Sequence, residues 1–102
     1  VKLFQLIKMS DLIVATGRFT VPKNGNYQFS LGSFDGISIS IDGKVLKSNW
    51  REGDYRVVDT PPVYLRTGGH IAVVNMFQVS KNYRFSVKIK GPGIPKQFMK
   101  AN

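Results

Sequence analysis

The chain has 102 residues, of which 42% are hydrophobic, and this composition is typical of one globular domain rather than of a disordered segment. It carries 15 Lys and Arg against 6 Asp and Glu, which gives a formal net charge of +9, and it contains no cysteine. The lack of cysteine excludes disulfides, thiolate metal sites and cysteine nucleophiles. No apolar run is long enough to span a bilayer, so we expect no membrane insertion. The positive charge favours polyanionic partners.

The first half of the chain predicts a series of short antiparallel strands. Residues 1–9 have the composition of an edge strand, and residues 12–21 predict a second strand that ends in a Pro-Lys-Asn-Gly turn. In residues 27–31 and 37–41, apolar side chains alternate with polar or small ones, which indicates strands with one buried face. The Asp-Gly dipeptide at 42–43 is a signal for a two-residue hairpin turn.

The second half repeats this pattern after a polar loop at residues 48–54. Pro61 and Pro62 separate two short apolar segments and must lie at a sheet edge or a bulge. Residues 71–79 are apolar on both faces, which predicts a central strand covered on both sides. Residues 85–89 alternate again. About seven to nine short strands without a helical period predict an all-β, antiparallel, jelly-roll-like β-sandwich.

The chain is expected to divide into three parts. Residues 1–11 form an N-terminal arm or edge strand, residues 12–93 form the sandwich domain, and residues 94–102 form a C-terminal tail that docks or links.

Several short motifs occur in a fixed order along the chain. They are Thr-Gly-Arg-Phe-Thr-Val-Pro at 16–22, Gly-Asn-Tyr-Gln-Phe-Ser-Leu at 25–31, Asp-Gly at 35–36, Ile-Asp-Gly-Lys-Val at 41–45, and more loosely Val-Tyr-Leu-Arg-Thr-Gly-Gly-His at 63–70 and Gly-Pro at 91–92. Their order and spacing resemble the anthrax-protective-antigen-type β-sandwich domain, often called PA-fourteen. The resemblance covers residues 12–92 and implies a short version of that domain.

In carbohydrate-binding members of that family, two adjacent Asp residues after the Tyr-x-Phe strand ligate calcium. Here the corresponding pair is Phe34 and Asp35, so half of that calcium site is missing. Calcium prefers six to eight oxygen ligands with several carboxylates, and the chain offers only Glu52 and five Asp. We therefore expect no metal site and no cofactor. Asp35 either contacts a sugar hydroxyl or a neighbouring loop, or simply caps the turn beside Gly36.

The loop that holds the only tryptophan is the best candidate for ligand contact. Asn49, Trp50 and Arg51 lie in this polar stretch, and an aromatic ring on a loop can stack on a sugar or anchor a protein partner. Alternatively, Trp50 folds back and caps one end of the sandwich. Together with Asp35, these residues form the predicted ligand-binding site.

Basic residues form the second candidate site, on two neighbouring patches. They are Lys44, Lys47, Arg51 and Arg56 in the middle of the chain and Arg84, Lys88 and Lys90 on one face of the last predicted strand. Such a basic patch can neutralise phosphates or sulfates, so a polyanion is a candidate partner. Outward lysines also protect sheet edges from aggregation. Nucleic acid is the less favoured partner, because the motif of an RNA-recognition or cold-shock sheet is absent.

Catalysis has little support in the sequence. His70 is the single histidine and has no identifiable nucleophile or carboxylate partner, so a structural hydrogen bond is expected. An enzyme would need His70 beside a carboxylate in a cleft.

We therefore predict a non-catalytic binding module, carbohydrate-binding or adhesive, on a secreted or surface-displayed protein, with an extracellular or cell-surface location. Its partners would be a glycan or neighbouring protein subunits. The alternative is a structural subunit that decorates a virion, filament or other large assembly and engages its neighbours through basic faces and terminal arms.

Overall fold

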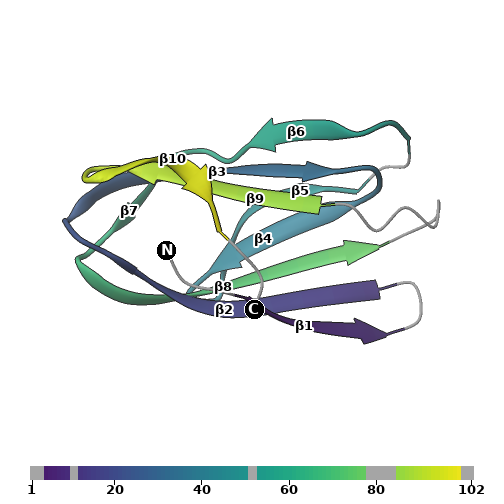
Figure 1. The fold of residues 1–102 in the computed structure, drawn as a ribbon, viewed down its shortest axis with the longest axis horizontal. Helices are drawn as coiled ribbons and strands as arrows, with labels where there is room; N and C mark the ends of the chain where they lie inside the picture. The colour runs from purple at the N-terminus through teal and green to yellow at the C-terminus, as the bar shows by residue number, and fades with distance from the viewer. Residues whose placement is uncertain (1–3, 10–11, 51–52, 78–84, 100–102) are drawn as a thin grey trace.

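Two antiparallel sheets face each other in the computed structural model, which describes residues 4–9, 12–50, 53–77 and 85–99 (Figure 1). The first sheet has the order β1-β2-β8-β4-β5 and consists of β1 (Phe4–Met9), β2 (Leu12–Val21), β8 (Gly68–Phe77), β4 (Ile37–Ile41) and β5 (Lys44–Asn49). The second has the order β10-β9-β3-β6 and consists of β10 (Ile94–Phe98), β9 (Phe85–Gly91), β3 (Gly25–Ser33) and β6 (Arg56–Asp59), with β7 (Val63–Leu65) also paired to β3. The predicted all-β antiparallel sandwich is confirmed. Within the described ranges, no helix is long and apolar enough to cross a membrane.

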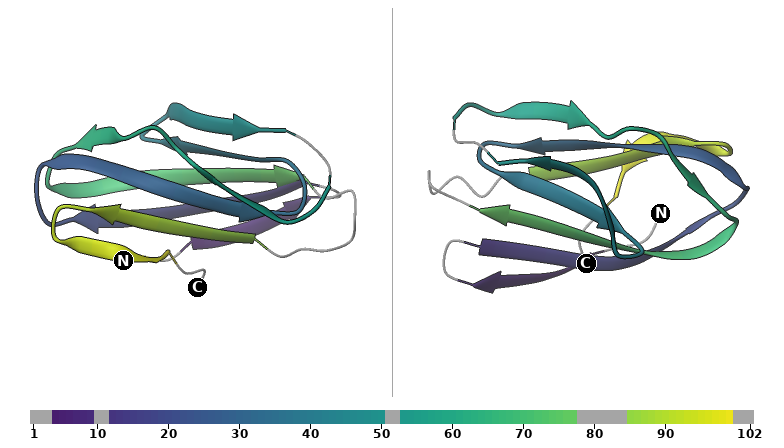
Figure 2. Two further views of the ribbon diagram at one scale, coloured as in Figure 1. Left: turned by 90° about the horizontal axis from the view of Figure 1, so that it is seen from above. Right: turned by 180° about the vertical axis from the view of Figure 1, so that it is seen from behind.

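The alternating segments form the core between the sheets, as expected. Tyr27, Phe29 and Leu31 on β3 are fully buried, and Val87 and Ile89 on β9 are buried beside them. The core also contains residues from the first sheet, namely Ile13, Ala15, Phe19, Val21, Ile37, Ile39, Ile41, Ala72, Val74 and Met76. Figure 2 shows the two layers from above and from behind.

Pro61 and Pro62 lie at an edge of the second sheet, which confirms the sequence prediction. β6 and β7 both pair with β3, one after the other along the same edge, and the prolines lie between them. A proline lacks the N–H that a strand needs for pairing, so the edge strand is interrupted there. Thr60 bridges the interruption, because its N–H donates to the Phe29 carbonyl and its hydroxyl accepts from the Phe29 N–H.

The Asp-Gly turn also forms as predicted. Asp42 and Gly43 have φ values of 51° and 85°, as a two-residue type I′ turn requires, and they connect the paired strands β4 and β5. β5 extends to Asn49, two residues into the segment that we expected to be a loop, because Ser48 and Asn49 pair with β4.

The prediction that residues 71–79 are covered on both faces is wrong for the part that the structure describes, residues 71–77. β8 is central in its sheet and buries Ala72, Val74 and Met76 on its inner face. Its outer face is only partly covered, and Ile71 is 43% exposed there. The outward residues Val73, Asn75 and Phe77 are only partly buried.

Both terminal segments add a strand to the sheets. β1 pairs with β2 and is the outermost strand of the first sheet. β10, in the segment predicted to be a C-terminal tail, pairs with β9 after a tight turn in which Gly93 has a φ of 74°. Ile94 and Met99 are buried, so residues 94–99 contribute to the core.

Candidate functional site

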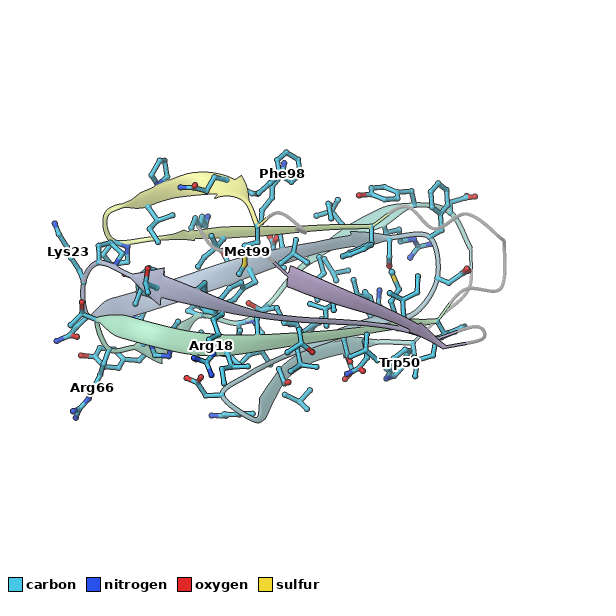
Figure 3. The ribbon with its side chains drawn as sticks, turned by 60° about the horizontal axis from the view of Figure 1, so that its bottom comes forward. Arg18, Lys23, Trp50, Arg66, Phe98 and Met99 are labelled. Carbon is cyan, nitrogen blue, oxygen red and sulfur yellow. The ribbon has the colours of Figure 1, made fainter. Side chains whose placement is uncertain are left out.

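One end of the sandwich gathers the aromatic residues of the predicted ligand-binding loops. At this end the chain passes from β3 to β4 and from β5 to β6, as the right-hand side of Figure 1 shows. Trp50 directly follows β5 and lies toward the end opposite Lys23 and Arg66 (Figure 3).

Trp50 is fixed on one side and exposed on the other. Its ring stacks on Phe77, with 5.5 Å between ring centroids and an interplanar angle of 24°, and Trp50 is 52% exposed. Gly36 lies beneath the pair, where its carbonyl accepts a hydrogen bond of 3.1 Å from the Phe77 N–H. A Cβ on Gly36 would meet both rings. The glycine therefore lets the two rings close over the start of β4.

Trp50 does cap the end of the first sheet in part, which is one of the two interpretations that the sequence left open. The ring partly covers the end of the first sheet, yet about half of its surface remains available to a ligand. Because Phe77 already restricts the ring, a ligand that stacks on it would immobilise little further side-chain motion. Aromatic rings with an apolar face and a polar N–H suit both sugar and protein contacts.

Asp35 does not reach the surface beside Trp50. It is only 1% exposed, and the Ser33 hydroxyl donates a 2.7 Å hydrogen bond to its backbone carbonyl, which closes the turn. The loop residues do not fit calcium, because Phe34 supplies no side-chain oxygen and Asp35 is buried. Among the described residues no group of three or more His, Cys, Asp or Glu could hold a metal ion.

Of the other two predicted loop residues, the structure describes Asn49 alone. Asn49 is half-buried and pairs with Ile37 on β4, one position before Trp50. Arg51 lies outside the described residues. Of the four predicted ligand-contact residues, Trp50 is therefore the one that the structure places at the surface with a large exposed area.

A second aromatic pair at the same end was not anticipated. Phe34 and Tyr55 meet edge to face, with 5.1 Å between ring centroids, and the Tyr55 hydroxyl lies 3.0 Å from the Ser86 hydroxyl. Phe77 was likewise missed as the partner of Trp50. The sequence gives no local signal for these contacts, since the two partners of each pair are more than 20 residues apart in the chain.

The predicted basic residues that the structure describes lie on strands of both sheets. Lys44 and Lys47 lie on β5 at the edge of the first sheet, and Arg56 lies on β6 at an edge of the second. Lys88 and Lys90 lie on β9, opposite Ser30 and Gln28 of β3. Arg84 lies outside the described residues. The structure therefore separates the cations of residues 44–56 between the two sheets.

His70 does lie beside a carboxylate, but its geometry does not suit a catalytic base. Its Nδ1 is 2.6 Å from Asp42 Oδ2 and its Nε2 is 2.7 Å from the Arg66 carbonyl oxygen, so both nitrogens face acceptors. Neither is free to take a proton from a substrate. The expected structural hydrogen bond is present, and Asp42 also accepts from the Ile71 N–H at 2.9 Å.

The Asp42–His70 contact shifts both pKa values toward the charged forms. Partial burial lowers the pKa of His70, but the hydrogen bonds to Asp42 and Arg66 and the charge of Asp42 raise it by more. Partial burial raises the pKa of Asp42, while the hydrogen bonds from His70 and Ile71 and the charge of His70 lower it by more. The pair therefore links the β4–β5 turn to the start of β8 by an ionic contact at mildly acidic pH.

A model of the PA14 domain matches residues 12–89, and the chain belongs to this family. The match confirms the resemblance seen in the sequence motifs, in a short version of the domain. A comparison with curated protein sequences finds no match.

Solved structures with the same fold include three that cover most of this chain. A PA14 domain of the MpAFP antifreeze protein is 16% identical, with a TM-score of 0.72, over 89% of this chain. An anti-sigma factor domain-containing protein from Clostridium clariflavum is 23% identical, with a TM-score of 0.74, over 87%. A PA14 sugar-binding domain from an RTX adhesin is 14% identical, with a TM-score of 0.69, over 88%. The chain spans 48%, 31% and 52% of those chains, respectively.

Proposed function

We propose that this chain is a non-catalytic carbohydrate-binding or adhesive module of a secreted or surface-displayed protein, and that Trp50 stacks on the bound saccharide. One observation carries the proposal, namely the half-exposed Trp50 ring held against Phe77 at the loop end of the sandwich. A ring held in this way offers a flat apolar surface for the C–H face of a sugar.

The family supports the ligand class. Similar structures include the sugar-binding domain of an RTX adhesin and a β-glucosidase from Kluyveromyces marxianus, in which this chain corresponds to 11% of the length. Such a small share fits a module added to a larger protein. The non-catalytic part of the proposal is supported by His70, whose two ring nitrogens are both occupied by acceptor oxygens.

Recognition is proposed not to depend on calcium. The loop that would supply the paired carboxylates holds Phe34 and the buried Asp35 instead. Affinity must then come from ring stacking and from hydrogen bonds to hydroxyls, which salt screens only weakly.

A glycan array probed with the purified chain tests this proposal. The array is read with calcium and with a chelator, and with Trp50→Ala beside the matched control Tyr64→Ala. Tyr64 lies on β7 and is 60% exposed, so its loss removes a comparable exposed ring at another place.

We expect binding of at least one neutral saccharide that survives the chelator, is lost in Trp50→Ala and persists in Tyr64→Ala. Absence of binding to any neutral glycan would refute the proposal. If the chain instead assembles with itself or with an acidic protein at low salt, the alternative of a structural subunit in a larger assembly would be favoured.

A further inference from the structure

The outer face of the second sheet carries a hollow that belongs to a different surface from Trp50. Its volume is about 370 Å³, within the size range of small-ligand sites, and its lining includes Ser30, Tyr55, Ser86, Lys88, Lys96 and Phe98. Ser30 and Lys88 are directly paired on β3 and β9, and both point away from the core, since their neighbours Phe29, Leu31, Val87 and Ile89 point inward. We call this hollow, together with the adjoining one described next, the β3–β9 trough.

A second hollow of about 450 Å³ continues the trough along the same strands. Its lining includes Gln28 and Lys90, which form the next outward pair on β3 and β9, and Lys96 lines both hollows. Outward residues two apart on a strand are about 7 Å apart, so Lys88 and Lys90 present two ammonium groups in a row.

Cations dominate the charge of the trough. Lys88, Lys90 and Lys96 are its charged lining residues among those that the structure describes. Within that part of the chain none of the three forms an ion pair. Asp59 places a carboxylate next to the floor, where its Oδ1 accepts a 2.6 Å hydrogen bond from the Ser30 hydroxyl. Three ammonium groups against one carboxylate leave an excess of positive charge that favours an anionic ligand.

The remaining lining offers an aromatic ring and hydroxyls. Phe98 is 52% exposed and points away from the core, whereas its neighbour Met99 is buried (Figure 3). The Lys88 ammonium lies 4.6 Å from the Phe98 ring centroid, so a cation–π contact holds it over the ring. The Ser86 hydroxyl also lines the hollow, 3.0 Å from the Tyr55 hydroxyl to which it is hydrogen-bonded.

We propose that the β3–β9 trough is a second ligand site, which binds an acidic oligosaccharide. Carboxylate or sulfate groups of the ligand contact Lys88, Lys90 and Lys96, a sugar ring lies against the exposed part of Phe98, and sugar hydroxyls reach Ser86. The inference goes beyond the proposal for Trp50, because the trough lies on the other sheet and either site can bind without the other.

The chemistry favours a saccharide over an acidic peptide. A peptide would gain most by pairing its backbone along an open strand edge, whereas the trough lies on a sheet face where backbone groups are already paired. Ammonium groups interspersed with hydroxyls and one ring match a ligand in which anionic groups, hydroxyls and apolar ring faces alternate.

Calorimetric titration of the chain tests the site with two probes, a hexagalacturonate and a chondroitin sulfate hexasaccharide, which separate carboxylate from sulfate recognition. The carboxyl-reduced hexagalacturonate serves as the uncharged control ligand, and a poly-glutamate peptide of equal charge as the peptide control. The variant Lys88→Gln/Lys96→Gln removes two charges from the trough. Arg18→Gln/Lys23→Gln removes two charges elsewhere, since Arg18 lies exposed on β2 and Lys23 in the turn at the end opposite Trp50 (Figure 3).

We expect the wild-type chain to bind at least one acidic probe. The affinity should be about tenfold weaker in Lys88→Gln/Lys96→Gln and should change less than about twofold in Arg18→Gln/Lys23→Gln. Phe98→Ala weakens the same binding without a change in charge, and Trp50→Ala leaves it intact. Thermal unfolding of each variant confirms that the fold is kept.

Four outcomes would overturn the inference. The first is no binding of either acidic probe, and the second is an equal loss of affinity in the two double variants. The third is binding of poly-glutamate or of the uncharged ligand as tight as that of the acidic probes. The fourth is binding of an acidic probe that Trp50→Ala removes and Lys88→Gln/Lys96→Gln does not. The last would place the acidic saccharide at the loop end and so support the proposed function alone.

Discussion

Replacing Gly36 by alanine tests the packing of the Trp50–Phe77 pair. The added Cβ would meet the rings of both residues, so at least one ring must move. Overpacking of this kind costs about 1–3 kcal/mol, and alanine recovers about 0.4–1 kcal/mol by restricting the unfolded chain. The midpoints of these two ranges leave a net loss of stability of about 1.3 kcal/mol, which lowers the Tm of a domain of this size by roughly 5–10 °C.

Thermal unfolding and tryptophan fluorescence measure the two consequences separately. Trp50 is the only tryptophan, so the emission reports its ring alone, and we expect a shift to longer wavelength as the ring becomes more exposed. Gly69→Ala is the matched control, because a Cβ there meets nothing within 4 Å, so we expect no loss of stability and a gain of up to about 1 kcal/mol. Unchanged stability and emission in Gly36→Ala, or equal changes in both variants, would refute the described packing.

Two further predictions concern the framework around the site. Tyr27→Phe removes a buried hydroxyl that lies 2.7 Å and 3.1 Å from two backbone carbonyl oxygens. Because the single hydroxyl proton makes about one hydrogen bond, urea unfolding should show a free energy of unfolding lower by about 1–2 kcal/mol. A decrease below about 0.5 kcal/mol would contradict this hydrogen bond. Because the pKa of His70 is raised in the folded state, protonated His70 stabilises the fold below about pH 6.5, and this stabilisation is lost as pH rises through the folded-state pKa of His70. Because the pKa of Asp42 is lowered, ionised Asp42 stabilises the fold above about pH 4, and this stabilisation is lost as pH falls through the folded-state pKa of Asp42. Asp42→Asn should therefore destabilise more at pH 5 than at pH 8 in urea unfolding, and a pH-independent effect would count against the ion pair.

The strands of the core could be predicted because burial on one face leaves a period of two in the sequence. Tyr27, Phe29 and Leu31 carry this pattern, and the structure buries all three. β10 carries no such pattern, because Ile94 is its only buried residue, and the next buried residue, Met99, follows the end of the strand. A strand that contributes so few buried residues is hard to distinguish from a tail by sequence alone.

The site was predictable only in part, for a related reason. The loop around Trp50 stands out by composition, but its partner Phe77 depends on the pairing of β8 with β4, which no local pattern reveals. Closeness in sequence was misleading for the cations, since Lys47 and Arg56 lie on either side of a connection that crosses between the sheets. Contacts across sheets need the fold, whereas exposed aromatic residues in loops can be found beforehand.

The affinity of Trp50→Ala for a neutral saccharide that the glycan array identifies is the most direct test of the central claim. Calorimetric titration at two salt concentrations compares this variant with the wild type and with Tyr64→Ala. We predict at least about tenfold weaker binding in Trp50→Ala, equivalent to about 1.4 kcal/mol, and wild-type binding in Tyr64→Ala. Wild-type affinity in Trp50→Ala would contradict the account and place saccharide recognition elsewhere on the sandwich.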